Sequence, residues 1–560
     1  MLQPNQPSVE AHLHHGVALS RANRHGEALK AFESACALNP ASGTAHNSRA
    51  NALRELDRAA EALEAYRKAI ELKPTSASFY SNYGSLLAEM GRHGEAAAAF
   101  AEALVLKPDF PLLPGLMLHA RMNVCDWRDI ETTKATLLSA IEAGQRVSPP
   151  WTVLSLVDSP DLHRKAAEIW VKGRYAENTP RPVSQSNQSN KLRIGYFSPD
   201  FRDHPVALLT AGLIEAHDRA EFEVHGFSYG PDAEGPVRQR LEKAFDSFVD
   251  IRTLSDAEAG ARARDMGLDI AIDLAGFTTY ARPGIFAARA APVQASYLGY
   301  AGTMASSSID YVIADRIVIP PAHRYYYTEK VVSLPCFQAN DRSRSMTDKS
   351  FTRTELGLPE EGFVYCCFNN AYKIAPEIFA RWMTVLERVP KSILWLRDYG
   401  AVAVSNLRVA ASERGINPAR LIFAGHVPFD EHLARHQAAD MFLDTSPYNA
   451  HTTAADALWA GLPVLTCAGQ SYPARVAASL LTAMNVPELI AATPEEYEAM
   501  AIALGREPAR LGPIKEKIVR GRQISRLFDA TAFARNMEAA FRGMARRARS
   551  GLPPEHIDIG

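Results

Sequence analysis

The chain has 560 residues, of which 47% are hydrophobic and 22% are charged, and its formal net charge is -2. This length predicts two to four domains, and the nearly balanced charge gives no electrostatic basis for binding nucleic acid or an anionic membrane. Six cysteines in so long a chain, with no Cys-x-x-Cys pair, indicate neither a disulfide framework nor a zinc site.

The start of the chain carries no recognisable targeting segment. Residues 1–10 are polar and lack the apolar core of a signal peptide. No run of 18 apolar residues occurs in the sequence, so we expect no membrane span. We therefore expect a cytoplasmic protein.

Residues 1–108 contain an internal repeat. Pro40, Pro74 and Pro108 each come two positions after a leucine and are spaced by 34 residues. Small, aromatic and small residues recur within each period: Ala28, Phe32 and Ala35, then Ala62, Tyr66 and Ala69, then Ala96, Phe100 and Ala103. A 34-residue period with this pattern is the tetratricopeptide repeat, in which stacked helix pairs form a concave surface. We expect three such units.

The repeat pattern weakens after Pro108. Residues 109–190 are predicted to hold degenerate repeat-like helices followed by a linker. The stretch 178–190 is polar and contains prolines, which is typical of an exposed linker. The boundary to the next domain is expected there.

Strand-like and helix-like segments alternate from residue 191 onward, in two series that predict two lobes, residues 191–345 and 346–545, and a tail, residues 546–560. The strand-like segments are 192–197, 222–227, 268–274, 293–298 and 311–314, then 363–368, 393–396, 421–423, 441–443 and 464–466. Such alternation predicts parallel, doubly wound sheets. Ligands of these folds bind at the carboxyl ends of strands, and two lobes in tandem suggest a cleft between them.

One polar turn between two predicted strands is suited to binding phosphate. Residues 444–461 lead from one strand into a helix that begins near His451, Thr452 and Thr453. The first turn of a helix offers unpaired N–H groups and a partial positive charge, which attract a phosphate. Asp456 lies one turn further on, where it could accept a hydrogen bond from a sugar hydroxyl. The alternative for this segment alone is an ordinary capped helix.

Other polar residues also follow predicted strands. His204 comes after the first strand of the first lobe, and Lys373 and His432 follow strands of the second lobe. Taken singly, they could be a loop histidine, a solvated lysine and a residue near a helix cap. Together they suit a nucleotide-diphosphate pocket. We find neither a P-loop nor a dinucleotide-binding glycine fingerprint, and no convincing Asp-x-Asp metal motif, so Lys373 and the helix terminus would neutralise the leaving group.

Several segments, taken together with the repeats, resemble a known family. These segments are 198–205, 297–303, 368–373, 451–461 and 475–479. The chain resembles the protein O-GlcNAc transferases, glycosyltransferase family 41, over about residues 9–542, and its short array suggests a bacterial-type member. The resemblance implies a multidomain fold: an α-helical tetratricopeptide superhelix followed by an α/β GT-B domain of two Rossmann-like lobes.

The resemblance also implies an activity. It is the inverting, metal-independent transfer of N-acetylglucosamine from UDP-GlcNAc to Ser or Thr hydroxyls of proteins, which the repeat array guides to the cleft. No nucleic acid and no membrane is implied as a partner. The transition state of such a transfer resembles an oxocarbenium ion, so the main catalytic task is to stabilise charge on the departing diphosphate.

The resemblance assigns roles to individual residues. His204 and Lys373 match the catalytic histidine and the lysine that contacts the donor diphosphate. Either His204 or a donor phosphate oxygen would take the proton of the acceptor. The residues matching donor-binding positions are Asn370, Lys373, Val427, Pro428, Phe429, His432, Leu433, Ala434, Arg435, His451, Thr452, Thr453 and Asp456.

Two departures leave alternatives open. Phe429 stands where the family has a lysine, and Asn370 occupies a position that is glutamine in animal members. Asn370 also occurs in the SPINDLY-type protein O-fucosyltransferases, which use GDP-fucose. Pro205 and the segment 451–456 fit the GlcNAc enzymes better, so we expect UDP-GlcNAc as donor. A repeat scaffold with an inactive, nucleotide-holding transferase domain is the other alternative.

Overall fold

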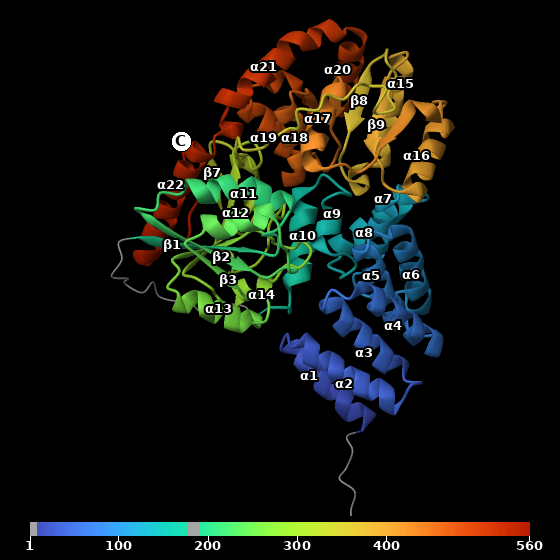
Figure 1. Cartoon of the computed structure of the whole chain (residues 1–560), viewed down its shortest axis with the longest axis vertical. Coiled ribbons are helices and arrows are strands. Elements are labelled where there is room, and N and C mark those ends of the chain that lie inside the picture. Colours follow the sequence, from blue (N-terminus) through green and yellow to red (C-terminus); the bar gives the residue numbers. More distant parts are fainter. Residues whose placement is uncertain (1–7, 176–190) are drawn as a thin grey trace, which may run out of the picture.

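The computed structural model describes residues 8–175 and 191–560 of the chain. Figure 1 shows a helical array that leads, through connecting helices, into two α/β lobes. The predicted fold class, helical repeats followed by an α/β domain with two parallel sheets, is confirmed. The predicted linker, residues 178–190, lies outside the described residues.

The array consists of paired helices as the repeat predicted. They are α1 (Val9–Arg21), α2 (His25–Leu38), α3 (Gly43–Glu55), α4 (Ala59–Leu72), α5 (Ala77–Glu89) and α6 (His93–Leu106). A Cβ atom added at Gly16 would lie 2.4 Å from the Phe32 ring, and one added at Gly84 would lie 2.6 Å from the Phe100 ring. The missing Cβ therefore lets the paired helices approach while the aromatic ring fills the interface.

Four helices connect the array to the lobes: α7 (Leu113–Asn123), α8 (Ile130–Glu142), α9 (Pro150–Val153) and α10 (Pro160–Val171). His119 of α7 packs against Tyr372 of the second lobe, with ring centroids 5.0 Å apart, and Trp170 of α10 lies 6.3 Å from Phe277 of the first lobe. The connecting helices therefore contact both lobes.

The array also contacts the first lobe near its own beginning. The side-chain amide of Asn23, in the turn between α1 and α2, donates to the carbonyl oxygen of Arg252 at 2.5 Å. Just beyond the array, the amide of Asn406 in the second lobe donates to the carbonyl oxygen of Val124 at 2.8 Å. One contact at the start of the array and one just beyond its end therefore join this part of the chain to both lobes.

The first lobe is built on an eight-stranded, parallel sheet in the order β14-β7-β6-β5-β4-β1-β2-β3. Its strands are β1 (Leu192–Ser198), β2 (Phe222–Ser228), β3 (Ser247–Asp250), β4 (Ile270–Asp273), β5 (Val293–Tyr297), β6 (Tyr311–Asp315), β7 (Lys330–Leu334) and β14 (Ile557–Asp558). Its own helices are α11 (Pro205–Ala216), α12 (Pro236–Ala244), α13 (Asp256–Asp265) and α14 (Pro283–Ala287). Strands β1, β2 and β5 are largely buried because helices cover the sheet, whereas the edge strands β3 and β14 are partly exposed.

The second lobe is built on a six-stranded, parallel sheet in the order β10-β9-β8-β11-β12-β13. Its strands are β8 (Val364–Cys367), β9 (Ile393–Arg397), β10 (Leu421–Ala424), β11 (Met441–Leu443), β12 (Val464–Cys467) and β13 (Ile490–Ala491). Its helices are α15 (Pro376–Arg388), α16 (Ala401–Glu413), α17 (Phe429–Arg435), α18 (Thr452–Ala460), α19 (Val476–Ala483), α20 (Pro494–Arg506) and α21 (Leu511–Ile524). Strands β8 and β11 are neighbours, so the loops that follow them lie side by side.

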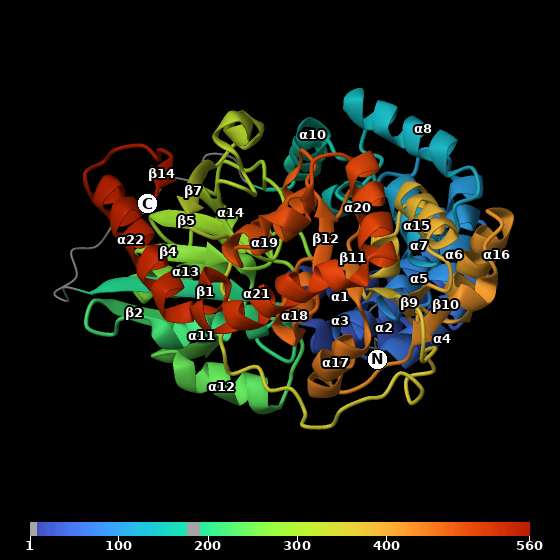
Figure 2. The ribbon, with the colours of Figure 1, turned by 90° about the horizontal axis from the view of Figure 1, so that it is seen from above.

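The end of the chain returns to the first lobe. Helix α22 (Ala530–Arg549) packs against α11, and β14 adds a strand beside β7. Figure 2 shows α22 on the side of β1 and β4. The residues expected as a tail, 546–560, therefore contribute to the sheet of the first lobe. The two-residue strand has no periodicity that a sequence could reveal, because pairing with β7 alone makes it a strand.

Within residues 8–175 and 191–560, no helix combines the length and the apolar character needed to cross a bilayer.

Candidate active site

Lys373 lies directly after β8, in a short 3-10 turn, and is only 9% exposed. Its ammonium donates to the carbonyl oxygen of Asn449 at 2.9 Å and sits 4.0 Å from the centre of the Tyr448 ring. Burial lowers the pKa of Lys373 to about 8, although the nearby carboxylate of Asp444 opposes this shift. Among the described residues no carboxylate forms an ion pair with it. The structure thus holds a buried cation whose other N–H groups remain for a ligand.

The loop that faces Lys373 is organised by Asp444, at the carboxyl end of β11. The carboxylate of Asp444 accepts hydrogen bonds from the backbone N–H groups of Thr445 and Ala450, and from the hydroxyl of Thr466 at 2.6 Å. Burial raises the pKa of Asp444 to about 6. These bonds curl the loop back so that the carbonyl of Asn449 meets the ammonium of Lys373. Asp444 was not predicted as a site residue, although its position directly after a strand was visible.

Helix α18 begins at Thr452, and its N-cap residue, His451, forms no side-chain capping hydrogen bond within the described part of the chain. His451 precedes it with φ −107° and ψ −92°. The predicted alternative, an ordinary capped helix, is therefore wrong, and the first-turn N–H groups stay available to an anion. The hydroxyl of Thr453 donates to the side-chain oxygen of Asn369, which ties the helix start to the loop after β8. Burial and the nearby Lys373 keep the pKa of His451 well below its usual value, so the imidazole is neutral.

Asp456 lies one turn into α18 and is 4% exposed. Its carboxylate accepts a hydrogen bond from Arg344, which belongs to the segment joining the two lobes, at 2.5 Å. The guanidinium of Arg344 also lies 5.7 Å from the centre of the Phe429 ring, at the start of α17. Arg344 was not predicted as a site residue, because it follows no strand and matches no motif.

Helix α17 and the loop before it carry the remaining predicted donor residues. Phe429 is 37% exposed, Val427 is half-buried and Pro428 is exposed. Leu433 is fully buried and Ala434 is 7% exposed, so their side chains belong to the core rather than to a ligand site. Within residues 432–435, only the polar side chains of His432 and Arg435 remain as candidates for contact with a donor.

These two polar side chains contact each other. The guanidinium of Arg435 donates to Nδ1 of His432 at 2.6 Å and to the carbonyl oxygen of Gly425 at 2.7 Å, and it stacks 4.8 Å from the Phe368 ring. Burial, together with the positive charges around it, lowers the pKa of His432 to about 2, so this ring is neutral. Asn370 lies apart, with its side-chain oxygen accepting from Arg397 at 3.1 Å.

His204 lies in the first lobe, at the N-terminus of α11. Its Nδ1 atom accepts from the backbone N–H of Val206 at 3.3 Å and lies 3.6 Å from a carboxylate oxygen of Asp200. The side chain is 33% exposed, and burial lowers its pKa although Asp200 opposes the shift. In the neutral ring the proton therefore sits on Nε2, which becomes a donor. The polar contacts of His204 are with its own lobe.

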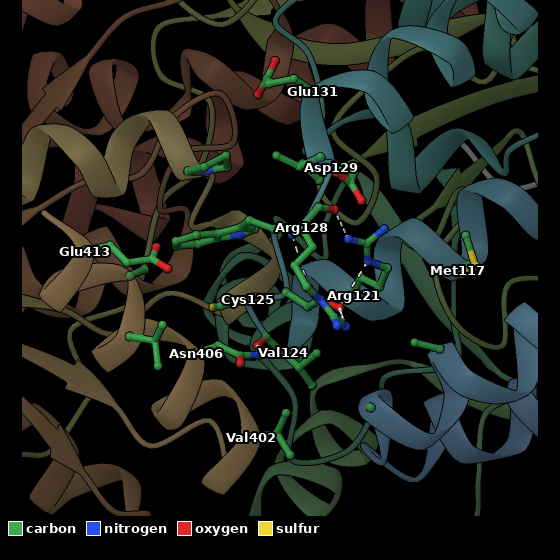
Figure 3. A pocket seen from close by; sticks show the side chains of 18 of the residues that line it. Met117, Arg121, Val124, Cys125, Arg128, Asp129, Glu131, Val402, Asn406 and Glu413 are labelled. Carbon is green, nitrogen blue, oxygen red and sulfur yellow. Dashed lines mark hydrogen bonds and ion pairs between the residues drawn. The ribbon is translucent and has the colours of Figure 1, made fainter.

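A separate cavity of about 1280 Å³ lies between the connecting helices and the second lobe. Figure 3 shows Arg121, Arg128 and Asp129 on one wall, and Asn406 and Glu413 on the other. It contains none of the predicted donor residues, so it is not the candidate active site. Within the described residues, no group of three or more His, Cys, Asp or Glu side chains is arranged to hold a metal.

The comparisons with known proteins identify the family of the two lobes and of the repeats. Residues 171–348 and 343–537 match the model of "Glycosyl transferase family 41". Residues 50–91 and 77–110 match models of the TPR and tetratricopeptide repeats. The chain is also similar to a solved structure of a Thermobaculum terrenum O-GlcNAc transferase mutant, with a TM-score of 0.74 and 27% identity, covering 98% of this chain and 100% of that one.

Curated relatives come from plants and an animal. A probable UDP-N-acetylglucosamine–peptide N-acetylglucosaminyltransferase SEC of Arabidopsis thaliana is 34% identical over 385 residues, 68% of this chain and 39% of that protein. The Caenorhabditis elegans UDP-N-acetylglucosamine–peptide N-acetylglucosaminyltransferase is 28% identical, covering 78% of this chain and 49% of that protein. A probable UDP-N-acetylglucosamine–peptide N-acetylglucosaminyltransferase SPINDLY of Petunia hybrida is 28% identical, covering 66% of this chain and 40% of that protein. The chain spans less than half the length of these relatives.

The family model covers both lobes, and the repeats that precede them are matched independently. The chain belongs to glycosyl transferase family 41.

Proposed function

We propose that this chain transfers N-acetylglucosamine from UDP-GlcNAc to Ser or Thr hydroxyls of proteins, with inversion at the anomeric carbon. The observation that carries the proposal is the buried ammonium of Lys373 beside the uncapped first turn of α18. A diphosphate bound there would meet a full positive charge and a set of backbone N–H groups together.

In the proposed reaction the acceptor oxygen forms a bond to the anomeric carbon while the bond from that carbon to the β-phosphate oxygen breaks. Negative charge therefore develops on the leaving UDP. We propose that Lys373, the N–H groups of α18 and the hydroxyl of Thr452 stabilise this charge. Because these groups are fixed by the loop around Asp444, little reorganisation is needed as the charge appears. We propose that they act in place of a metal ion.

The proton of the acceptor hydroxyl is proposed to pass to a phosphate oxygen of the donor. With Nδ1 of His204 accepting from Val206, its Nε2–H group can donate a hydrogen bond but cannot accept a proton. We propose that His204 orients a reacting oxygen by this hydrogen bond. His204→Asn, which keeps a donor N–H group, is expected to retain more single-turnover activity than His204→Ala. Equal and complete loss in both variants would instead point to a general base.

We propose that the repeat array guides the acceptor polypeptide. We also propose that the protein acts in the cytoplasm. Asn23 joins the start of the array to the first lobe, and Asn406 of the second lobe contacts Val124 just beyond the array, which supports a defined position of the array relative to the candidate donor site. Stacked helix pairs of this kind offer extended concave surfaces to a polypeptide.

The experiment that tests the proposal has two parts. Calorimetric titration of the full chain with UDP and with GDP should show binding of UDP and much weaker binding of GDP. Incubation with labelled UDP-GlcNAc and candidate proteins should then label protein at Ser or Thr. Preference for GDP would favour fucosyl transfer, and nucleotide binding without any transfer would favour an inactive scaffold.

A further inference from the structure

Arg344 is placed against two elements of the candidate donor site at once. It belongs to the segment between β7 and β8, yet its Nη1 atom donates to Asp456 of α18, and its guanidinium faces Phe429 of α17. The side chains of Arg344 and Asp456 are only 5% and 6% exposed. A charged side chain from an interlobe segment is thus inserted between two helices of the second lobe.

The guanidinium has hydrogen-bonding capacity that the protein does not use. Nε and Nη2 of Arg344 are buried and form no hydrogen bond with any residue that the structure describes. A guanidinium presents its N–H groups as a rigid planar fork. Buried charged donors without an acceptor are costly, so an oxygen acceptor brought by a ligand would be bound favourably at this point.

The position along α18 indicates which part of a ligand this would be. The proposed diphosphate seat is at Thr452 and Thr453, at the start of the helix, where Lys373 also lies. Asp456 is about one helical turn, roughly 5.4 Å, further along. Arg344 therefore lies beyond the diphosphate, on the side where a nucleotide continues into its sugar and base.

We propose that Arg344 binds the nucleoside half of the donor. Its Nε–H and Nη2–H groups donate to oxygen atoms of the uridine, while its Nη1–H holds Asp456 in position for the ribose. This inference rests on the proposed function. It adds a specificity residue from outside the second lobe, because the segment is also anchored to the first lobe, where Asp341 accepts from Arg240 of α12 at 2.9 Å.

The test is calorimetric titration of the full chain with UDP, UMP and pyrophosphate, in the wild type and in Arg344→Met, Arg344→Lys and Arg342→Met. Arg342 is the matched control, since it lies in the same segment but is exposed and donates to the carbonyl oxygen of Gln523. We expect Arg344→Met to weaken UDP and UMP binding by the same factor, about tenfold to a hundredfold. Pyrophosphate binding and the control variant should be unchanged.

Arg344→Lys separates recognition from a purely structural role. Lysine keeps the charge beside Asp456 but lacks the planar fork, so we expect it to bind UMP about as weakly as Arg344→Met does. If Arg344→Lys bound UMP as tightly as the wild type, Arg344 would act only as a positive charge beside Asp456, and the proposal would be overturned. Unchanged or tighter UDP binding in Arg344→Met would also overturn it, as would an equal loss for pyrophosphate. Failure of the wild type to bind UDP would instead overturn the proposed function itself.

Discussion

At the scale of single residues, the site is governed by buried charges whose partners are few and specific. Lys373 keeps its ammonium in a buried position with one carbonyl and one aromatic ring as neighbours. Asp444 uses its buried carboxylate to shape the loop that provides that carbonyl. Among the described residues, the ammonium of Lys373 therefore forms no ion pair, and its charge can interact with a ligand.

Lys373→Met should abolish transfer while leaving the protein folded. We expect loss of about two to three orders of magnitude in turnover, because a fixed charge at a developing anion contributes roughly 3–4 kcal/mol. Thermal melting should show an intact fold, since methionine fills the same buried space. Lys349→Met, at a lysine whose side chain is 55% exposed, is the control and should behave as the wild type. Near-normal turnover in Lys373→Met would contradict the role.

The pH dependence of the transfer reaction should reflect the protonation of Lys373. Burial lowers the pKa of Lys373 to about 8 in the free protein, so above that pH the ammonium loses its proton and its charge. The ratio kcat/KM for the donor should fall about tenfold per pH unit above 8. The fall in kcat should come at higher pH, because a bound diphosphate stabilises the ammonium. A flat kcat/KM between pH 7 and 9.5 would argue against a required charge at Lys373.

At the scale of elements, the end of the chain is fixed to the first lobe by a buried polar relay. Glu538 of α22 accepts from Nδ1 of His217 at 3.1 Å and from the backbone N–H of Asp218 at 2.8 Å, and His217 contacts the hydroxyl of Tyr196 in β1 at 2.8 Å. The side chains of His217 and Glu538 are 0% and 1% exposed. This relay explains why α22 packs on α11 and delivers β14 to the edge of the sheet.

Removing the carboxylate of that relay should destabilise the first lobe. We expect Glu538→Ala to lower the free energy of unfolding by about 3–5 kcal/mol, because it leaves buried polar groups without a partner. Urea denaturation measures the loss. Glu555→Ala is the control, since Glu555 is 66% exposed and its pair with Arg547 should contribute less than about 1 kcal/mol. Equal midpoints for the two variants would show that the relay does not hold α22.

At the scale of the whole molecule, the connecting helices reach the candidate donor site by direct packing. Tyr372, the residue before Lys373, lies between His119 of α7 and Tyr448 of the loop around Asp444, with ring centroids 5.0 Å and 6.1 Å away. The connecting helices thus pack against the turn that carries Lys373.

Tyr372→Ala should therefore weaken donor binding although Tyr372 is not proposed to touch the donor. We expect UDP affinity to fall about three- to tenfold, because each aromatic contact contributes roughly 0.5–1.5 kcal/mol to holding the turn. Calorimetry measures the affinity. Tyr325→Ala, at a tyrosine that is 66% exposed, should leave it unchanged. Unaltered UDP binding in Tyr372→Ala would show that the turn is rigid without the connecting helices.

The sequence by itself determined the features that depend on a local pattern of residues, namely the repeated helix pairs and the two parallel sheets. The 34-residue period specified the helix pairs, since each unit repeats the same small and aromatic contacts. The alternation of apolar segments specified two parallel sheets, and the residues that follow strands, such as Lys373 and Thr452, were predictable because the carboxyl ends of parallel strands gather at one edge. The predicted strands are present, whereas β3, β7, β13 and β14 were not predicted.

Only the tertiary structure decided what depends on contacts between distant residues. It returned α22 and β14 to the first lobe, placed Leu433 in the core, left α18 uncapped and paired Arg344 with Asp456 across 112 positions of the chain. No short stretch of sequence indicates these features, because each depends on residues that are distant in the chain and meet only in the folded protein. The sequence therefore identified the residues that we propose surround a diphosphate, and the fold supplied the loop and the arginine that lie beside them.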